Sequence, residues 1–428
     1  MLNKEEREQI ISLMQHEVVP AMGCTEPVAV ALCAARAAEL LGALPERVEV
    51  ELSMNVLKNA MGVGIPGTGG MIGLPIAIAL GMIVGKSSYK LEVLKEVTPE
   101  AVKRGKQYID EGRISIRLKE DAPDGLYIKV SVYDGARVEK AVICGAHTRF
   151  VEEDYSPKQH DETVGELQSN DVDDVVLNLR CIYDFVVEVP LEEIAFIEES
   201  GKMNMAAAES AFKARYGHRV GNMLKDEKML DMVGDGTLTH VMAYTCSACD
   251  ARMSGAAIPV MSNSGSGNQG IAATVPVAVY ARDHKVAHDT YVRALALSNL
   301  VAIYIKQSLG RLSALCGCIV ASTGASCGIT YMLGGSYEQM GYAVKNMIAN
   351  LTGMICDGAK PSCSLKLSSG VSTAMLSAML AMQDCSVTYL EGIIDEDVDR
   401  SIKNLTAIGR EGMDETDSLI LDIMTSKC

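Results

Sequence analysis

Hydrophobic positions recur with two different periods along this chain, and the change of period predicts how the chain is organised. Helical spacing occurs over residues 4–18, and a second helix is expected from Pro27 to Gly42, with Thr25 as its cap. Residues 48–57 alternate between apolar and polar positions, as do several segments between about 113 and 190. From about residue 191 the pattern predicts helices over 202–225, 284–309, 336–352, 370–383 and 395–407.

These periods predict an α+β fold with a mainly α-helical catalytic domain and a smaller α/β module in the N-terminal half. We place the N-terminal α+β region at residues 1–190 and the helical domain at residues 191–428. Two uncharged runs, 59–85 and 312–335, exceed the ~20 residues of a membrane span. Their many Gly, Pro, Ser, Thr and Cys residues instead favour buried segments. The polar, acidic stretch 152–174 is expected to be a mobile loop.

Composition narrows the function classes. The 428 residues carry 39 Lys and Arg against 55 Asp and Glu, a formal charge of −16, which opposes general binding to nucleic acid or to an anionic membrane surface. Aromatic residues make up 4% and Trp is absent, so base-stacking platforms are few. A small molecule is therefore the expected partner. The sequence does not fix the oligomeric state, and a homodimer is possible.

Thirteen cysteines follow an N-terminus that is charged and helical, without the features of a secretory signal. Such thiols indicate a reducing cytoplasm. Cys246 and Cys249 form a CxxC, but no second pair accompanies them, so buried helix residues are the better interpretation. Of the seven histidines, His147 in GAHTRF is the best candidate for a site, although most lone histidines are structural.

A glycine-rich stretch begins at Gly62-Val-Gly64-Ile-Pro-Gly67, which formally matches GxGxxG after a strand. Further Gly and Pro residues delay any helix, and the acidic residue expected about 20 positions on is missing, so a dinucleotide site is disfavoured. A loop that lets backbone approach a small substrate, with Lys58 and Asn59 beside it, is preferred.

A second small-residue loop, SNSGSGNQG, precedes an apolar segment that is expected to be helical. Backbone N–H groups and hydroxyls at a helix start can hold a carboxylate or phosphate, which makes Ser264, Gly265, Ser266 and Asn268 candidate binding residues. An ordinary linker between two helices has comparable weight.

The strongest chemical feature is a group of thiols in the helical half. Five of the thirteen cysteines fall within 48 residues: Cys316, Cys318, Cys327, Cys356 and Cys363. Soft sulfur ligands suit an iron–sulfur cluster, and the turn-rich loop between Cys356 and Cys363 could fold both sulfurs onto one cluster. A helical core that uses Cys like Ala explains the pattern about as well.

The segments AMGCTEP, KNAMGVGIPGTGG, GAHT, SNSGSGNQG and GMICDGAKPSC together resemble the L-cysteine desulfidases, relatives of the alpha-chain domain of iron–sulfur-dependent L-serine dehydratases. The resemblance covers nearly the whole chain. It implies a [4Fe-4S] cluster held by three cysteines, which map onto Cys316, Cys356 and Cys363, with Cys318 as the rival of Cys316. Serine dehydratases have a serine-rich segment where this chain has Cys24, and this thiol favours cysteine as the substrate.

The resemblance also implies the reaction, an α,β-elimination of L-cysteine to pyruvate, ammonia and hydrogen sulfide. An iron with one open position acts as a Lewis acid on the leaving group, and no pyridoxal phosphate is implied. Cys24 precedes a helix start, which predicts a lowered pKa and a role as the base for the α-proton, or as a displaceable iron ligand. L-Serine dehydratase is the alternative enzyme, and a non-catalytic iron–sulfur or thiol redox sensor and a cofactor-free carboxylate-binding protein are the alternatives from other classes.

Overall fold

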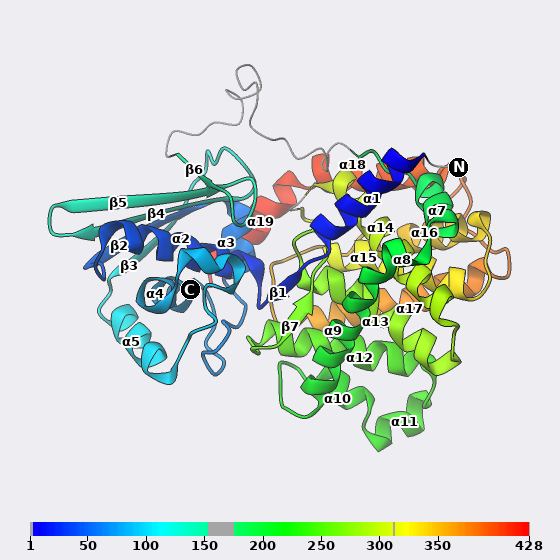
Figure 1. Cartoon of the computed structure of the whole chain (residues 1–428), viewed down its shortest axis with the longest axis horizontal. Helices are drawn as coiled ribbons and strands as arrows, with labels where there is room; N and C mark the ends of the chain where they lie inside the picture. The colour runs from blue at the N-terminus through cyan, green and yellow to red at the C-terminus, as the bar shows by residue number, and fades with distance from the viewer. Residues whose placement is uncertain (1–2, 153–174, 311–312, 428) are drawn as a thin grey trace, which may run out of the picture.

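The computed structural model describes residues 3–152, 175–310 and 313–427. Figure 1 shows two units side by side, a smaller one built on a sheet and a larger one built of helices. The predicted α+β class, mainly α-helical with a smaller α/β part, is confirmed. The stretch 152–174 lies almost wholly outside the described residues.

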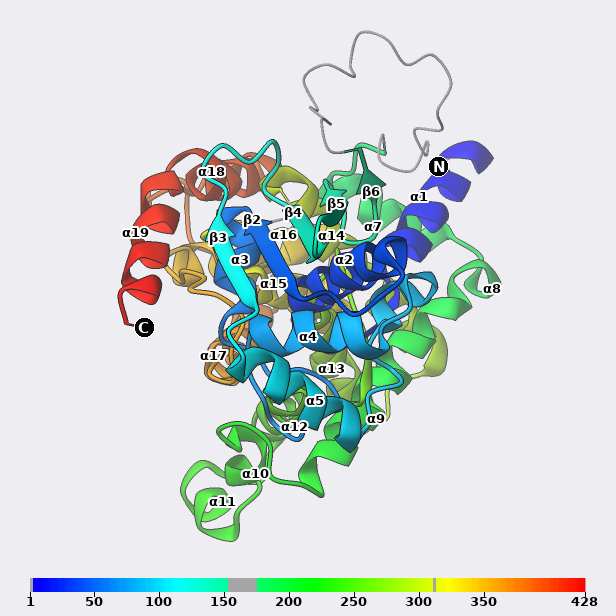
Figure 2. The same ribbon diagram turned by 90° about the vertical axis from the view of Figure 1, so that its left-hand side faces the viewer.

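The smaller unit contains a five-stranded sheet in the order β3-β2-β4-β5-β6, which Figure 2 shows with this unit facing the viewer. Strand β2 is parallel to β3, and the other neighbours are antiparallel. The strands are β2 (Arg47–Leu52), β3 (Ile114–Leu118), β4 (Tyr127–Asp134), β5 (Arg137–Cys144) and β6 (Phe150–Val151). The apolar alternation of Val48, Val50 and Leu52 places these side chains in the core.

Helix α2 (Thr25–Leu41) packs on β4 and β5, and the other helices of this unit complete the same core. These other helices are α3 (Met54–Ala60), α4 (Leu74–Val84), η1 (Ser87–Glu92) and α5 (Pro99–Asp110). Helices α2 and α4 pack closely because Gly81 has no side chain. A Cβ there would stand 2.3 Å from the Ala31 carbonyl oxygen.

Two sequence predictions for the N-terminal region are wrong. The strand predicted over 48–57 ends at Leu52, and α3 follows because Val56, Leu57 and Ala60 bury one helical face. Residues Leu179–Glu188 form the helix α7 inside the region predicted as β. Leu179, Ile182 and Phe185 recur every three residues, which is helical spacing rather than alternation.

The larger unit is built around α15 (Gly317–Met332), whose residues from Cys318 to Thr330 are all buried. Gly324 permits the close contact with α14, since a Cβ there would stand 2.1 Å from the Ser298 carbonyl oxygen. Helices α13 (Gly267–His284), α14 (His288–Leu309), α16 (Tyr337–Leu351) and α17 (Cys363–Ala381) pack on α15. Further helices of this unit are α8 (Leu191–Ile194), η2 (Ala195–Ile197), α9 (Glu198–Phe212), α10 (Val220–Leu224), α11 (Glu227–Val233), α12 (Thr237–Met253), α18 (Val398–Glu411) and α19 (Asp414–Thr425).

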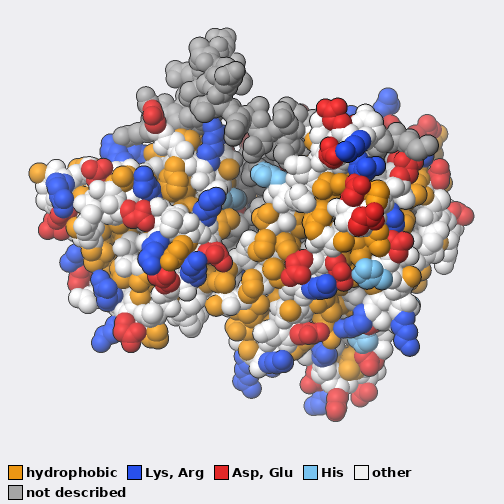
Figure 3. Space-filling model, in the orientation of Figure 1, with side chains coloured by type: hydrophobic (Ala, Val, Ile, Leu, Met, Phe, Trp, Pro, Cys, Tyr) orange, Lys and Arg blue, Asp and Glu red, His pale blue; other side chains and the backbone are white. Residues whose placement is uncertain are grey.

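The uncharged run 312–335 therefore supplies the central buried helix, and the run 59–85 supplies a loop and α4. Among the described helices, none has both the length and the apolar character that crossing a bilayer requires. On the face shown in Figure 3, acidic and basic side chains are interspersed between apolar ones.

Chain segments from both ends connect the two units. Helix α1 (Lys4–Glu17) buries Ile10, Leu13 and Met14 in the core of the helical unit. Strand β1 (Pro20–Met22) pairs antiparallel with β7 (Pro259–Met261) of that unit. Helix α19 packs against α3 of the sheet unit. The division at residue 190 stays a prediction, and these contacts cross it.

Candidate active site

A cavity of about 90 Å³ is lined by residues of both units. A cavity of this size suits a small molecule rather than a macromolecule. The sheet unit and the segment before it contribute Cys24, Glu26, Asn59 and His147. The helical unit contributes Arg252, the loop before α13, Lys306 and the segments around Cys316 and Cys363.

A short antiparallel bridge assembles the cysteine-rich wall. Leu315 pairs with Ile355, the Cys316 N–H donates to the Met354 carbonyl (3.1 Å), and the Cys356 N–H donates to the Ala314 carbonyl (2.6 Å). Cys316 immediately precedes α15, and Cys363 is the first residue of α17. The three predicted ligands therefore line one cavity, and the rival Cys318 lines it too.

The local charges distinguish Cys316 from Cys318. A hydrogen bond from Cys318 lowers the pKa of the Cys316 thiol, burial opposes this shift, and the positive charge of Lys366 adds to it. The same hydrogen bond and burial raise the pKa of Cys318. Because the thiolate is the form that binds metal, the electrostatics favour Cys316 as the ligand.

Asp357 lies between two lysines beside this wall. The Lys360 ammonium donates to the carbonyls of Asp357 (2.9 Å) and Gly358 (3.1 Å), and Lys366 donates to the Asp357 carboxylate (2.5 Å). Burial opposes ionisation of Asp357, but the hydrogen bonds from both lysines hold its pKa at about 2. This network fixes the loop between Cys356 and Cys363.

No set of three or more His, Cys, Asp or Glu side chains within residues 3–152, 175–310 and 313–427 is already arranged around a metal position. The donor chemistry nevertheless fits an iron–sulfur cluster. Three thiols line one cavity from three chain positions, and soft sulfur is the ligand that such clusters take.

Cys24 occupies the N-cap position of α2, so the helix begins two residues before the predicted Pro27. The Cys24 thiol donates to Glu26 Oε2 (3.0 Å), and the Thr25 hydroxyl donates to the same oxygen (3.0 Å) instead of capping the helix. Burial and the negative charge of Glu26 raise the pKa of Cys24, while Arg252 opposes the shift. The predicted lowering of this pKa is wrong, because the helix start does not outweigh burial and an adjacent carboxylate.

The serine–glycine loop connects β7 to α13, as the sequence predicted for a loop before a helix. Ser266 is the N-cap of α13, and its hydroxyl accepts from the Gln269 N–H at 3.5 Å. Ser264 has φ 48°, an uncommon conformation for a residue with a side chain. Ser264, Gly265, Ser266 and Asn268 all line the cavity.

Of the residues in and beside the glycine-rich stretch, some line the cavity and others have a structural role. Asn59 lines the cavity, but Lys58 does not, because its ammonium forms an ion pair with Asp417 of α19 (2.5 Å). Gly64 lies against the helical unit, where a Cβ would stand 2.3 Å from the backbone of Ser254. The absence of a side chain at Gly64 therefore allows the two units to pack closely.

Sequence reasoning missed or undervalued several residues of the cavity. These are Glu26, His147, Arg252, Gln269 and Lys306. His147 follows β5 in GAHT, and Arg252, in the last turn of α12, is only 3% exposed. An arginine among Cys, Ala and Ser residues was the available signal.

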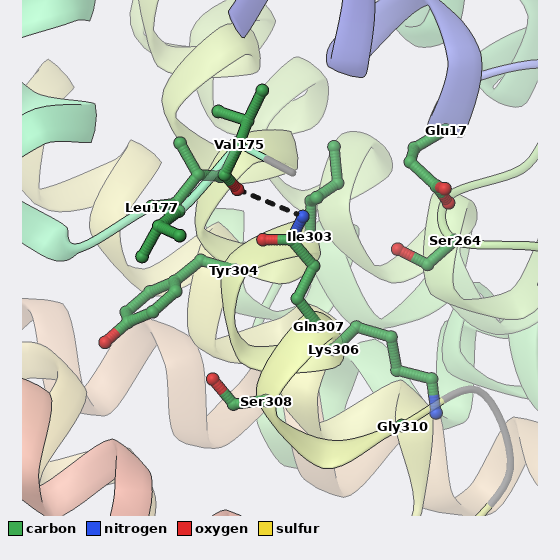
Figure 4. A pocket seen from close by; sticks show the side chains of 11 residues that line it. Glu17, Val175, Leu177, Ser264, Ile303, Tyr304, Lys306, Gln307, Ser308 and Gly310 are labelled. Carbon is green, nitrogen blue, oxygen red and sulfur yellow. Dashed lines mark hydrogen bonds between the residues drawn. The ribbon is translucent and has the colours of Figure 1, made fainter. Parts of the chain in front are cut away.

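A second hollow of about 440 Å³ adjoins the cavity and shares Ser264 and Lys306 with it. In Figure 4 the side chains of Glu17, Ser264 and Lys306 line this hollow, and Gln307 Nε2 donates to the Val175 carbonyl (3.5 Å). The two hollows therefore meet at Ser264 and Lys306.

The chain is similar to proteins of a known family. The family model of the serine dehydratase alpha chain matches residues 88–422. The chain belongs to the serine dehydratase alpha chain family. The predicted resemblance is thereby confirmed at the level of the family, which is of lyase type and typically iron–sulfur dependent.

Relatives of this serine dehydratase alpha chain homologue extend over its full length. A "UPF0597 protein" of Phocaeicola vulgatus is 60% identical over 433 residues, covering 100% of this chain and 99% of its own. One from Bacteroides fragilis is 59% identical over 431 residues and covers 100% of both chains. One from Oleidesulfovibrio alaskensis is 43% identical over 426 residues, with 99% of each chain covered.

Proposed function

We propose that this protein is an L-cysteine desulfidase. The observation that carries the proposal is the position of Cys24, whose thiol lines the same cavity as the serine–glycine loop and the cysteine-rich wall. The cavity thus combines a proton-accepting pair, donors for a carboxylate and soft ligands for a metal group.

Cys316, Cys356 and Cys363 would hold the [4Fe-4S] cluster. When bound, the cluster supplies a Lewis acid for the group that leaves Cβ of the substrate. Lys366 balances the negative charge of the thiolates, since its ammonium lies beside the Cys316 wall.

The protein's own residues bind the amino acid and move its proton. Ser264, Gly265, Ser266 and Asn59 offer hydrogen bonds from two sides of the cavity. Cys24 passes its thiol proton to its hydrogen-bond partner Glu26, and the resulting thiolate takes the α-proton. The electrons of the Cα–H bond form the Cα–Cβ double bond as the Cβ–S bond breaks. Sulfide leaves with a proton, and water converts aminoacrylate to pyruvate and ammonia.

L-Serine dehydratase is the second candidate, favoured by the name of the family whose model matches the chain. The same elimination would then release water. The free thiols of all described cysteines support the proposed cytoplasmic location for either enzyme.

The deciding experiment compares L-cysteine and L-serine with anaerobically reconstituted protein, measuring sulfide and pyruvate together. We expect equal release of sulfide and pyruvate from L-cysteine and a lower kcat/KM for L-serine. Preference for L-serine would show that the protein is an L-serine dehydratase instead. Release of neither sulfide nor pyruvate would show that it catalyses neither elimination.

Cys24→Ser separates the two roles of that thiol, with Cys33→Ser, a buried thiol elsewhere on α2, as the control. If Cys24 is the base, the variant assembles its cluster and binds L-cysteine but no longer exchanges the α-proton with deuterium from solvent. If Cys24 is a displaceable ligand, the cluster spectrum changes before substrate is added. Normal turnover by the variant would remove Cys24 from the chemistry.

A further inference from the structure

Three buried polar atoms at the cavity have no hydrogen-bond partner within the described protein. They are Arg252 Nε, Asn268 Oδ1 and Gln269 Oε1. Their residues are 3%, 4% and 4% exposed, and all three line the cavity. A buried polar group without a partner is costly, so these atoms indicate a ligand that supplies the missing bonds.

Arg252, in the last turn of α12, lies beside the first residue of α13. A Cβ on Gly267, the first residue of that helix, would lie 2.3 Å from Arg252 Nε, so the guanidinium packs directly on the backbone there. The N-terminal end of a helix carries unpaired N–H groups and a partial positive charge. The guanidinium and the helix start are thus two positive features at one place, and both favour a carboxylate.

The two acceptors without a partner belong to Asn268 and Gln269, the second and third residues of α13. Asn268 Nδ2 donates to Met253 Sδ (3.3 Å), which leaves Oδ1 as the unpaired atom of that amide. Gln269 packs on Gly317, the residue after Cys316, where a Cβ would stand 2.9 Å from its Nε2. Both amide oxygens accept hydrogen bonds and neither donates, so they suit an ammonium group with its three N–H donors.

We propose that Arg252 and the N-terminus of α13 bind the α-carboxylate of the substrate, and that Asn268 and Gln269 bind its α-ammonium group. The site then selects a free zwitterionic α-amino acid and rejects molecules that lack either charge. This inference rests on the proposed function for the identity of the substrate. It assigns Asn268 to the ammonium group, whereas the sequence pattern assigned it to the carboxylate.

The test measures binding without turnover, by calorimetry on the reconstituted holoenzyme. L-Alanine carries both charges but no leaving group, ethylamine lacks the carboxylate, and propionate lacks the ammonium group. The wild-type protein should bind L-alanine about tenfold or more tightly than either fragment, because each lost charge removes charge-assisted hydrogen bonds.

Each variant should lose one preference. Arg252→Gln should bring L-alanine and ethylamine to similar affinity while L-alanine stays preferred over propionate. Gln269→Leu should do the converse. Arg252→Lys retains the charge and should give an intermediate ratio, which covers the case that Arg252→Gln does not fold. Arg400→Gln, at an exposed position of α18, is the matched control.

The inference is overturned if Arg252→Gln or Arg252→Lys keeps the wild-type ratio of L-alanine to ethylamine affinity. Failure of the proposed function looks different. In that case no sulfide or pyruvate is released from L-cysteine, while the affinity ratios of the variants still change as described.

Discussion

The Cys24 thiol donates a hydrogen bond to Glu26 Oε2 at 3.0 Å, within the first turn of α2. This carboxylate gives the thiol a proton acceptor inside the cavity, and its charge raises the pKa of Cys24 together with burial. The resting form of Cys24 is therefore the thiol. Deprotonation would have to be coupled to a positive charge that enters the cavity, such as the substrate ammonium group.

Glu26→Gln should lower the pKa of Cys24, because the substitution removes the negative charge that raises it. Burial remains, so the pKa should stay above that of a free thiol. The measurement is the pH dependence of alkylation at Cys24 in cluster-free protein, followed by peptide mass spectrometry. Glu39→Gln, near the other end of α2, is the control. An unchanged alkylation profile in Glu26→Gln would show that the carboxylate does not act on the thiol.

How far the sequence could predict the site depends on how local each part is. The loop from Ser264 to Asn268 and the loop from Cys356 to Cys363 are each contiguous, so their residue types indicated chemistry directly. The bridge between Leu315 and Ile355 joins positions 40 residues apart, and no local pattern predicts it. Arg252 was missed for the same reason, since only the packing of α12 on α13 brings it to the cavity.

Neighbours in sequence can also diverge in space. Lys58 and Asn59 follow one another on α3, where successive side chains point about 100° apart. Asn59 therefore faces the cavity while Lys58 reaches α19. The sequence around both residues resembled a strand running into a loop, which gave no means of separating them.

Cys316→Ala, Cys356→Ala and Cys363→Ala should each prevent incorporation of iron and sulfide during anaerobic reconstitution. Cys318→Ala should retain the cluster, because the Cys318 hydrogen bond and Lys366 favour the thiolate on Cys316. Iron and acid-labile sulfide content together with the visible spectrum measure the result. Cys327→Ala, buried in the same helix outside the cavity, is the control.

The reverse pattern, with loss in Cys318→Ala and retention in Cys316→Ala, would shift the ligand by two residues. If all three ligand variants retain a full cluster, these three thiols do not hold it.

Ser266→Ala should raise the Michaelis constant roughly tenfold or more if the hydroxyl binds the substrate carboxylate through a charge-assisted bond of about 1.5–3 kcal/mol. The same hydroxyl caps α13, so stability should fall by about 0.5–2 kcal/mol as well. Steady-state kinetics and thermal unfolding separate the two effects. Ser336→Ala, the cap of α16 away from the cavity, should show only the loss of stability. An unchanged Michaelis constant would leave Ser266 with a capping role alone.

Lys58 should act on stability rather than on substrate binding, because it is fully buried and paired with Asp417. Lys58→Met leaves the Asp417 carboxylate buried without its partner, which should cost about 3–5 kcal/mol. Helix α19 would then detach from α3 more readily, and amide hydrogen exchange should rise in α19 first. The double variant Lys58→Met/Asp417→Leu replaces both charges with apolar groups and should recover most of the stability. A Lys58→Met protein of normal stability with a raised Michaelis constant would instead return Lys58 to the substrate site.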